Sequence, residues 1–153
     1  MIEIESSSPD ETEAVAAAVA AELVAGDVVT VAGELGSGKT TFVRGAARAL
    51  GVEARVTSPT YTIGHLYEGR VRVAHLDLYR FDGMSDPEWS DLERYFEDTI
   101  AFVEWPEAGA GFLARPRVEV SLRHLGERHR LIVLSAAQKA LENRLFAHGR
   151  PRV

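Results

Sequence analysis

The octapeptide Gly33–Thr40, Gly-Glu-Leu-Gly-Ser-Gly-Lys-Thr, constrains the possible folds more than any other feature of the chain. It follows Val28–Ala32, a short apolar and β-branched segment that is typical of a buried strand. It precedes Thr40–Leu50, which reads as a helix that is stopped by Gly51. The pattern G-x-x-x-x-G-K-[S/T] between a strand and a helix is that of a phosphate-binding loop. We therefore expect an α/β domain with an anion site at the end of a buried strand.

Each fixed position of this loop has a physical role. Glycines allow successive backbone N–H groups to converge on one point at the N-terminus of the helix, where an anion is favoured. Lys39 is expected to reach the β- and γ-phosphates of ATP, and the hydroxyl of Thr40 to ligate Mg²⁺. Thr41 either contacts the α-phosphate or fills the first helical turn. The predicted phosphate cradle comprises Gly33, Gly36, Ser37, Gly38, Lys39, Thr40 and Thr41.

The rest of the chain alternates helix-like and strand-like stretches. Helices are expected over 10–25, 86–96 and 136–147, and strands over 61–67, 70–76, 99–104, 118–122 and 131–134. Such alternation predicts a three-layer, P-loop NTPase-like α/β domain with a mixed, largely parallel central sheet. Residues 1–147 are expected to form this single domain. Residues 148–153 are expected to be a disordered tail or a docking segment.

Two acidic residues are expected near the phosphate loop, because each follows a predicted strand. Glu104 ends the apolar run Ile100–Val103, and Asp77 ends the more mixed segment Val71–Leu76. Strand ends in such sheets open onto the ligand crevice, where a carboxylate can ligate Mg²⁺. We assign Glu104 to the metal and Asp77 to orienting or deprotonating the attacking water, although the residues alone allow the reverse. Trp105 either packs over the nucleotide or anchors the core.

Composition excludes several classes of protein. The chain has 153 residues, a formal net charge of -6 and no cysteine. These features argue against broad independent binding to nucleic acid, and against disulfides or a thiolate metal site. No secretory leader and no apolar run of about 18 residues is evident, so we expect a cytoplasmic protein without a membrane segment. The arginines of the C-terminal third are interpreted as solvated side chains rather than as a binding patch.

Four segments, taken in order, resemble the TsaE (YjeE) family, the ATPases of bacterial tRNA threonylcarbamoyladenosine synthesis. They are Gly33–Phe42, Ser58–Tyr61, His75–Arg80 and Val103–Glu107. The resemblance implies ATP binding and hydrolysis to ADP, with Mg²⁺, in support of the TsaD–TsaB transferase. It also implies that tRNA is reached only through these partners.

The resemblance carries roles to individual residues. Thr40 and Glu104 match the Mg²⁺ ligands, and Asp77 matches the catalytic acid. Ser58 and Thr60 match a switch-like loop whose hydroxyls sense the γ-phosphate; without the family this segment reads as an ordinary turn at Pro59. Thr12, or Glu11 beside it, matches a position near the adenine.

Two other functions remain open at this stage. A small P-loop kinase acting on a metabolite would need an arginine-rich lid, and the chain leaves little room for one. A nucleotide-dependent binding module with incidental hydrolysis would carry the same motifs. Since no arginine is evident beside the loop, we expect weak ATPase activity without partners. Arg80 is either a contributor to catalysis or a surface residue.

Overall fold

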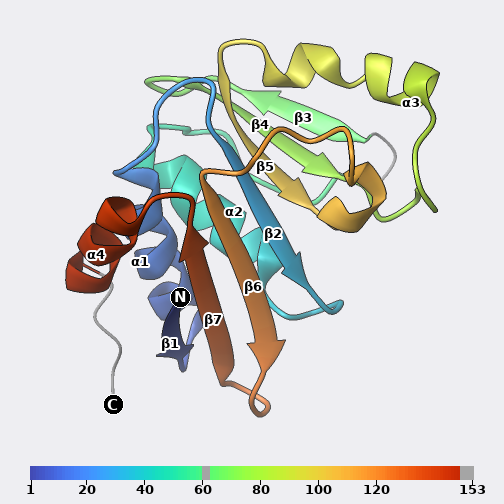
Figure 1. Ribbon diagram of the computed structural model, residues 1–153. Helices are drawn as coiled ribbons and strands as arrows, with labels where there is room; N and C mark the ends of the chain where they lie inside the picture. The colour runs from blue at the N-terminus through green and yellow to red at the C-terminus, as the bar shows by residue number, and fades with distance from the viewer. Residues whose placement is uncertain (60–62, 149–153) are drawn as a thin grey trace.

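The computed structural model describes residues 1–59 and 63–148, and in this part of the chain seven strands form one sheet (Figure 1). The strand order is β1-β7-β6-β2-β5-β4-β3. The strands are β1 Ile2–Ser6, β2 Val28–Gly33, β3 Gly64–Tyr67, β4 Arg72–Asp77, β5 Thr99–Glu104, β6 Val118–His124 and β7 Arg130–Ala136. The inner strands β6, β2, β5 and β4 run parallel, and antiparallel pairings of β1 with β7, β7 with β6 and β4 with β3 complete the sheet. The predicted mixed α/β sheet is confirmed.

Helices cover the two faces of the sheet unequally. The helices are α1 Pro9–Ala20, α2 Lys39–Ala49, α3 Asp86–Ser90 and α4 Lys139–His148, with 3₁₀ turns at Glu93–Phe96 and Pro106–Gly109. Helices α1, α2 and α4 share one hydrophobic cluster with side chains of β2, β5 and β7. The shorter segments after β4 and β5 pack against the opposite face of β4 and β5. The outer layers therefore consist of three longer helices on one side, and of the short helix α3 and 3₁₀ turns on the other.

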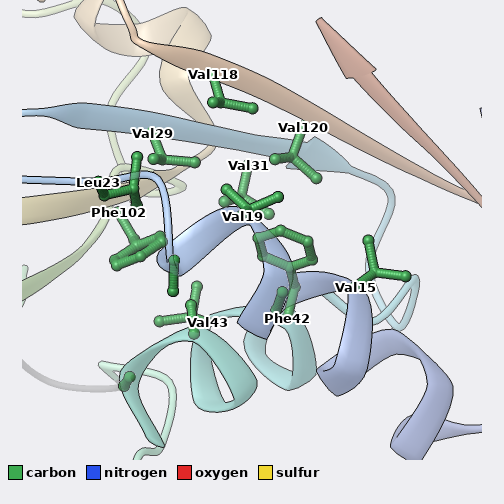
Figure 2. Close-up of a cluster of buried hydrophobic side chains, with 14 of the residues drawn as sticks. Val15, Val19, Leu23, Val29, Val31, Phe42, Val43, Phe102, Val118 and Val120 are labelled. Atoms are coloured by element: carbon green, nitrogen blue, oxygen red, sulfur yellow. The ribbon is translucent and has the colours of Figure 1, made fainter. Parts of the chain in front are cut away.

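Strand alternation explains how one chain supplies both clusters. In β2, Val29 and Val31 point to the helical side and meet Phe42 and Val43 of α2 (Figure 2). Val28 points to the other side and joins the second cluster. Burying both faces of a parallel strand favours the continuous apolar run seen in this segment. Because Phe42 is fully buried, its packing fixes the first turns of α2, and with them the phosphate loop.

Helices α1 and α2 approach each other closely at a glycine. A Cβ atom on Gly45 of α2 would lie 2.6 Å from Cα of Glu13 on α1. Arg48, one turn further along α2, forms an ion pair of 2.8 Å with Glu13. The absence of a side chain at position 45 therefore sets the spacing between the two helices.

Besides shifts of one to three residues at other element ends, three sequence-based expectations differ from the structure. Helix α1 ends at Ala20 rather than at residue 25, because the chain turns so that Gly26 can donate a hydrogen bond to the carbonyl of Thr99 at 2.8 Å. The predicted helix 86–96 is interrupted after Ser90, and a 3₁₀ turn begins at Glu93. Strand β1 was not predicted. The break in the predicted helix after Ser90 allows Leu92 and Tyr95 to face the sheet, where both are buried.

The predicted helix at the end of the chain begins at Lys139 and includes residue 148. Residues 149–153 of the predicted tail lie outside the described residues, as does Thr60 of the switch-like segment. None of the helices in the described ranges is long and apolar enough to cross a membrane.

Candidate functional site

The predicted phosphate loop connects the central strand β2 to helix α2. Helix α2 begins at Lys39, and Gly38 precedes it with a left-handed φ of 104°. No side chain caps the first N–H groups of this helix. Uncapped amides at a helix N-terminus attract anions, because they are unpaired donors at the positive end of the helix dipole. The loop therefore has the local geometry of an anion site.

Gly33 is required at the start of the loop by close packing. A Cβ atom there would lie 2.6 Å from the carbonyl oxygen of Leu122 and 2.5 Å from Oγ of Ser37. Ser37 itself is fully buried, and its hydroxyl has no hydrogen-bond partner among the described residues. The loop is thus packed tightly against β6, and side chains larger than hydrogen are excluded at position 33.

The ammonium group of Lys39 lies inside the loop. It donates hydrogen bonds to the carbonyl oxygens of Gly33 and Glu34, at 2.7 and 2.9 Å. It also lies 4.4 Å from the ring centroid of Trp105. Burial lowers the pKa of Lys39, while the nearby carboxylates of Glu104 and Asp77 act in the opposite direction. A buried cation held only by carbonyl oxygens and a ring is well prepared to exchange these contacts for a phosphate.

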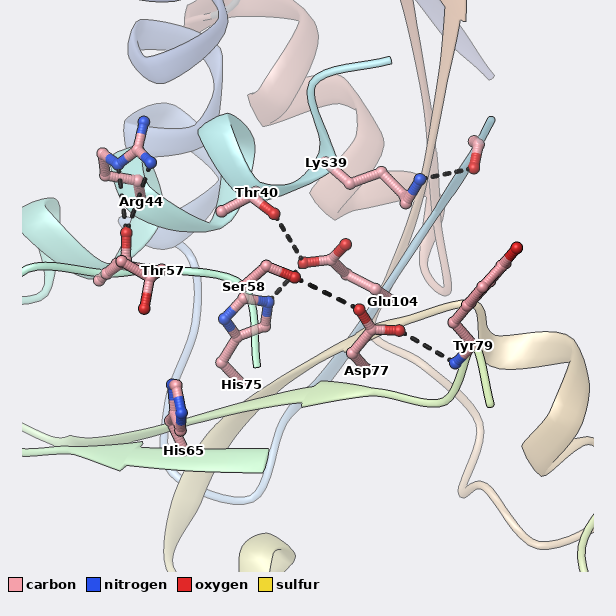
Figure 3. A network of polar contacts seen from close by, with 12 residues as sticks. Lys39, Thr40, Arg44, Thr57, Ser58, His65, His75, Asp77, Tyr79 and Glu104 are labelled. Atoms are coloured by element: carbon pink, nitrogen blue, oxygen red, sulfur yellow. Dashed lines mark hydrogen bonds and ion pairs between the residues drawn. The ribbon is translucent and has the colours of Figure 1, made fainter. Parts of the chain in front are cut away.

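Glu104 lies at the end of β5 and faces the start of α2 (Figure 3). One of its oxygens, Oε2, accepts a hydrogen bond from the Thr40 hydroxyl at 3.3 Å and is 2.5 Å from Nε2 of His75. His75 and Glu104 are both buried. The other ring nitrogen of His75 has no partner among the described residues. Both contacts fall on the same carboxylate oxygen, so Glu104 is held from two sides.

Asp77 lies beside Glu104, since the two residues are paired in the register of the parallel strands β4 and β5. Its carboxylate accepts hydrogen bonds from the Tyr79 amide at 3.0 Å and from the Ser58 hydroxyl at 3.4 Å. Burial raises the pKa of Asp77, and the hydrogen bond from Tyr79 partly opposes the rise. A carboxylate with a raised pKa is a stronger base than an ordinary aspartate.

Two adjoining cavities surround the start of α2. The first, of about 170 Å³, brings together Lys39, Thr40, Asp77, Glu104 and Trp105, along with Leu35, Gly36, Gly38, Thr41 and Ser58. The second, of about 400 Å³, is lined by Ser7, Ser8, Pro9, Thr12, Gly38, Thr41, Glu127, Arg128 and Arg130. Gly38 and Thr41 line both. The two cavities therefore adjoin at the first turn of α2, where one ligand with a polyphosphate and a larger organic part would contact both.

A magnesium site would have to be shared with a ligand. In the described residues no group of three or more His, Cys, Asp or Glu side chains is arranged to hold a metal ion. The Thr40 hydroxyl and the Glu104 carboxylate do lie together, and such oxygen donors suit Mg²⁺, which usually keeps waters and phosphate oxygens as its other ligands. The donor set at the end of β5 is compatible with that arrangement.

Two residues assigned from the sequence to the nucleotide, Thr12 and Trp105, line the cavities, and two contacts at the site were not predicted. Thr12 lines the second cavity but is buried, and its hydroxyl is 2.7 Å from that of Ser6. Trp105 borders the first cavity, with a left-handed φ of 54° and its ring 5.0 Å from that of Tyr79. The contact between His75 and Glu104 was not predicted, although His75 alternates with Val73 and Asp77 along β4. The arginine at the loop, Arg130, was likewise missed.

A phosphate loop between a central parallel strand and its helix, with carboxylates at two neighbouring strand ends, defines a P-loop NTPase-like domain. The family model described as "Threonylcarbamoyl adenosine biosynthesis protein TsaE" matches residues 6–132. The chain therefore belongs to the TsaE family.

Individual relatives are similar over most of their length. A tRNA threonylcarbamoyladenosine biosynthesis protein TsaE from Bacillus subtilis is 36% identical over 137 residues, which cover 88% of this chain and 85% of the relative. The TsaE of Treponema pallidum is 36% identical over 72% of this chain and 82% of its own length. The crystal structure of Bacillus subtilis YdiB has a TM-score of 0.76 and 31% identity, covering 97% of this chain and 94% of that one.

Proposed function

We propose that this chain binds and hydrolyses ATP, with Mg²⁺, as the accessory ATPase of tRNA threonylcarbamoyladenosine biosynthesis in the cytoplasm. The relatives carry that biosynthetic role in their names. The observation that carries the ATPase part is one cavity at the start of α2 that gathers Lys39, Thr40, Asp77 and Glu104. A base, a metal-ligating pair and a phosphate-binding cation are the groups that phosphoryl transfer to water requires.

Lys39 and the loop amides are assigned to the phosphates. The Lys39 ammonium would exchange the carbonyls of Gly33 and Glu34 for phosphate oxygens, which are stronger acceptors because they are charged. The N-terminal amides of α2 would donate to the same anion. The adenosine part would occupy the larger cavity, where Thr12 forms part of the wall.

Thr40 and Glu104 are assigned to Mg²⁺. The ion, when bound, would neutralise charge that develops on the phosphate oxygens. His75 and Thr40 both contact Oε2 of Glu104 and so hold the carboxylate in place. This arrangement removes the need to order a flexible side chain when the metal arrives.

Asp77 is assigned to the attacking water, as an orienting group or general base. Asp77 takes no part in the hydrogen bond between Thr40 and Glu104, but it lines the same cavity as these two residues. Burial raises the pKa of Asp77, which makes its carboxylate a stronger base for accepting a proton from water. The hydroxyl of Ser58, which donates to Asp77 at 3.4 Å, connects this carboxylate to the segment that resembles a switch loop.

TsaD and TsaB homologues are the proposed partners, and tRNA is reached through them. Their involvement is supported by the family to which the chain belongs. The exposed Leu35 lines the catalytic cavity, and the exposed ring of Tyr79 lies 5.0 Å from that of Trp105, which also lines it, so these side chains offer contacts to a partner. We expect the isolated chain to hydrolyse ATP slowly, and the TsaD–TsaB complex to accelerate it.

The decisive experiment compares the only two lysines of the chain, Lys39 and Lys139. ATP affinity is measured by titration calorimetry with Mg²⁺ for the wild type, Lys39→Ala and Lys139→Ala. Removing a buried cation from its anion costs about 2 kcal/mol or more, so Lys39→Ala should bind at least about 30-fold more weakly. Lys139 is exposed and should behave as the wild type. Equal affinity in all three proteins would contradict the assignment of the loop.

Hydrolysis is tested separately with radiolabelled ATP. Release of labelled phosphate to water, increased by TsaD–TsaB and lost in Asp77→Asn, would support the ATPase. Transfer of the label to an added metabolite would instead indicate a kinase. Tight binding without phosphate release, even with the partners, would indicate a nucleotide-dependent binding module.

A further inference from the structure

Arg130, the first residue of β7, connects the phosphate loop to a turn that is distant in sequence. Its Nη2 atom donates a hydrogen bond to the carbonyl oxygen of Gly36 at 3.3 Å. Its Nη1 atom lies 3.1 to 3.4 Å from the carbonyl oxygens of Gly126, Glu127 and His129. Residues 125–129, which we call the β6–β7 turn, join the two strands visible at the lower end of Figure 1. One guanidinium group therefore bridges this turn and the phosphate loop.

The contact with Gly36 controls the orientation of one peptide group of the loop. In a trans peptide the C=O and the following N–H point in opposite directions. Because Arg130 holds the Gly36 carbonyl from outside the loop, the N–H of Ser37 points inward, where it donates to the carbonyl of Glu34 at 3.1 Å. Glu34 accepts from Lys39 as well. A change at the Gly36 carbonyl is thus transmitted to the atoms that are proposed to hold phosphate.

The same arginine also forms part of the wall of the second cavity. Arg130 and the turn residues Glu127 and Arg128 line this cavity together with Gly38 and Thr41. Leu125 closes the turn with a hydrogen bond from its amide to the carbonyl of His129 at 2.9 Å. The turn therefore borders the space assigned to adenosine, while its arginine contacts the loop assigned to phosphates.

No carboxylate of the described residues forms an ion pair with Arg130. In the described residues Arg130 forms no salt bridge, and its recorded hydrogen bonds all go to main-chain carbonyls. Arginine suits such a bridge, because its planar fork presents several donors at fixed angles, whereas lysine presents a single point charge. A role that needs only charge and a role that needs the fork can therefore be separated by substitution.

We propose that Arg130 is a positioning residue that couples phosphate binding at Gly36–Ser37 to ordering of the β6–β7 turn, which lines the adenosine cavity. The proposal rests on the nucleotide site described above and adds a coupling between its two halves. Arg130 orders a loop peptide and a turn at once, so ligand contacts that fix either one reduce the cost of ordering the other.

The test combines affinity with hydrogen–deuterium exchange. Four proteins are compared: the wild type, Arg130→Ala, Arg130→Lys and the control Arg123→Ala, which removes an exposed arginine at the end of β6. Each is titrated with ATP and with inorganic tripolyphosphate, which has no adenosine. Exchange of the amides in residues 125–129 is followed with and without tripolyphosphate, and folding is verified by thermal unfolding.

Coupling predicts that tripolyphosphate slows exchange in the turn of the wild type and of Arg123→Ala, although this ligand cannot fill the adenosine cavity. The protection should be lost in Arg130→Ala and in Arg130→Lys. ATP affinity should fall about tenfold in Arg130→Ala, which corresponds to about 1.4 kcal/mol.

Two results would overturn the coupling while leaving nucleotide binding intact. One is equal protection of the turn in wild type and Arg130→Ala; the other is full protection in Arg130→Lys, which would reduce the role to charge. A wild-type protein that binds tripolyphosphate but not ATP would refute the proposed function instead. If Arg130→Ala fails to fold, the lysine variant and its exchange pattern decide the question.

Discussion

The contact between His75 and Glu104 should appear as a coupling energy in a double-mutant cycle. The two side chains are buried and 2.5 Å apart, so the Nε2–H of His75 donates to a carboxylate that has little access to water. A hydrogen bond to a charged group contributes about 1.5–3 kcal/mol. We therefore expect a coupling of about 2 kcal/mol between His75→Leu and Glu104→Gln.

The single variant His75→Leu should show a smaller effect than this coupling. It loses the hydrogen bond to Glu104, but it also removes the buried Nδ1 atom, which has no partner among the described residues. An unpaired buried polar group costs about 1–3 kcal/mol, and its removal offsets much of the loss. Only the cycle separates the two contributions, since the cost of Nδ1 is the same with and without Glu104.

The assay is urea unfolding at neutral pH in the presence of a chelator, followed by circular dichroism. The wild type, both single variants and the double variant complete the cycle. A control cycle pairs His65→Leu with Glu104→Gln, since His65 contacts Tyr67 rather than Glu104. The control should be additive within about 0.5 kcal/mol. A coupling of about 0.5 kcal/mol or less between His75→Leu and Glu104→Gln would show that the histidine does not hold Glu104 in place.

Two further substitutions test the site and the helix packing. Burial raises the pKa of Asp77, so its contribution favours folding at acidic pH and is lost as pH rises through the raised pKa. Asp77→Asn should therefore increase the thermal unfolding temperature at pH 8 more than at pH 4, while phosphate release falls by about 100-fold or more. Gly45→Ala would gain about 1 kcal/mol from helix propensity alone, but the 2.6 Å approach to Cα of Glu13 should cost about 1–3 kcal/mol. Calorimetric unfolding should show a lower transition temperature, and an increase would show that α1 moves aside freely.

The parts of the fold that were predicted from the sequence depend on local spacing. The loop Gly33–Thr40 and its flanking strand and helix lie where expected, because the strand is continuous and apolar and the glycines interrupt both elements. The hairpin of β3 and β4 and that of β6 and β7 were also recognised, since turn residues separate their apolar segments. The positions of these elements could be predicted because they depend on the local sequence alone.

The elements that were missed depend on contacts distant in sequence. Strand β1 shows a two-residue alternation, with Ile2 and Ile4 buried, but five residues of alternation become a strand only through pairing with β7. The break after Ser90 is set by the surface against which Leu92 and Tyr95 pack. The hydrophobic periodicity of the sequence does not indicate where that surface lies.

The residues of the candidate site also fall into two groups, those that local motifs predicted and those that depend on contacts distant in sequence. Lys39, Thr40 and Glu104 were assigned from motif and strand ends, and they line one cavity. The supporting contacts were not foreseen. His75 is separated from Glu104 by 29 positions, and Arg130 is separated from Gly36 by 94. Side chains that support a site lie at no fixed distance from it in the sequence, so they are recognised only in the folded structure.

The pairing of the first strand with the last has a consequence for biosynthesis. On the ribosome, Ile2–Ser6 emerges before β2 to β6, whereas its hydrogen-bonding neighbour, Arg130–Ala136, is synthesised after all of them. Until β7 has been synthesised, this segment therefore stays unpaired, with its isoleucines exposed to other nascent chains or to chaperones. Premature termination before residue 130 would leave this segment permanently without its neighbour, so incomplete products should be recognised and degraded rather than accumulate as partly active protein.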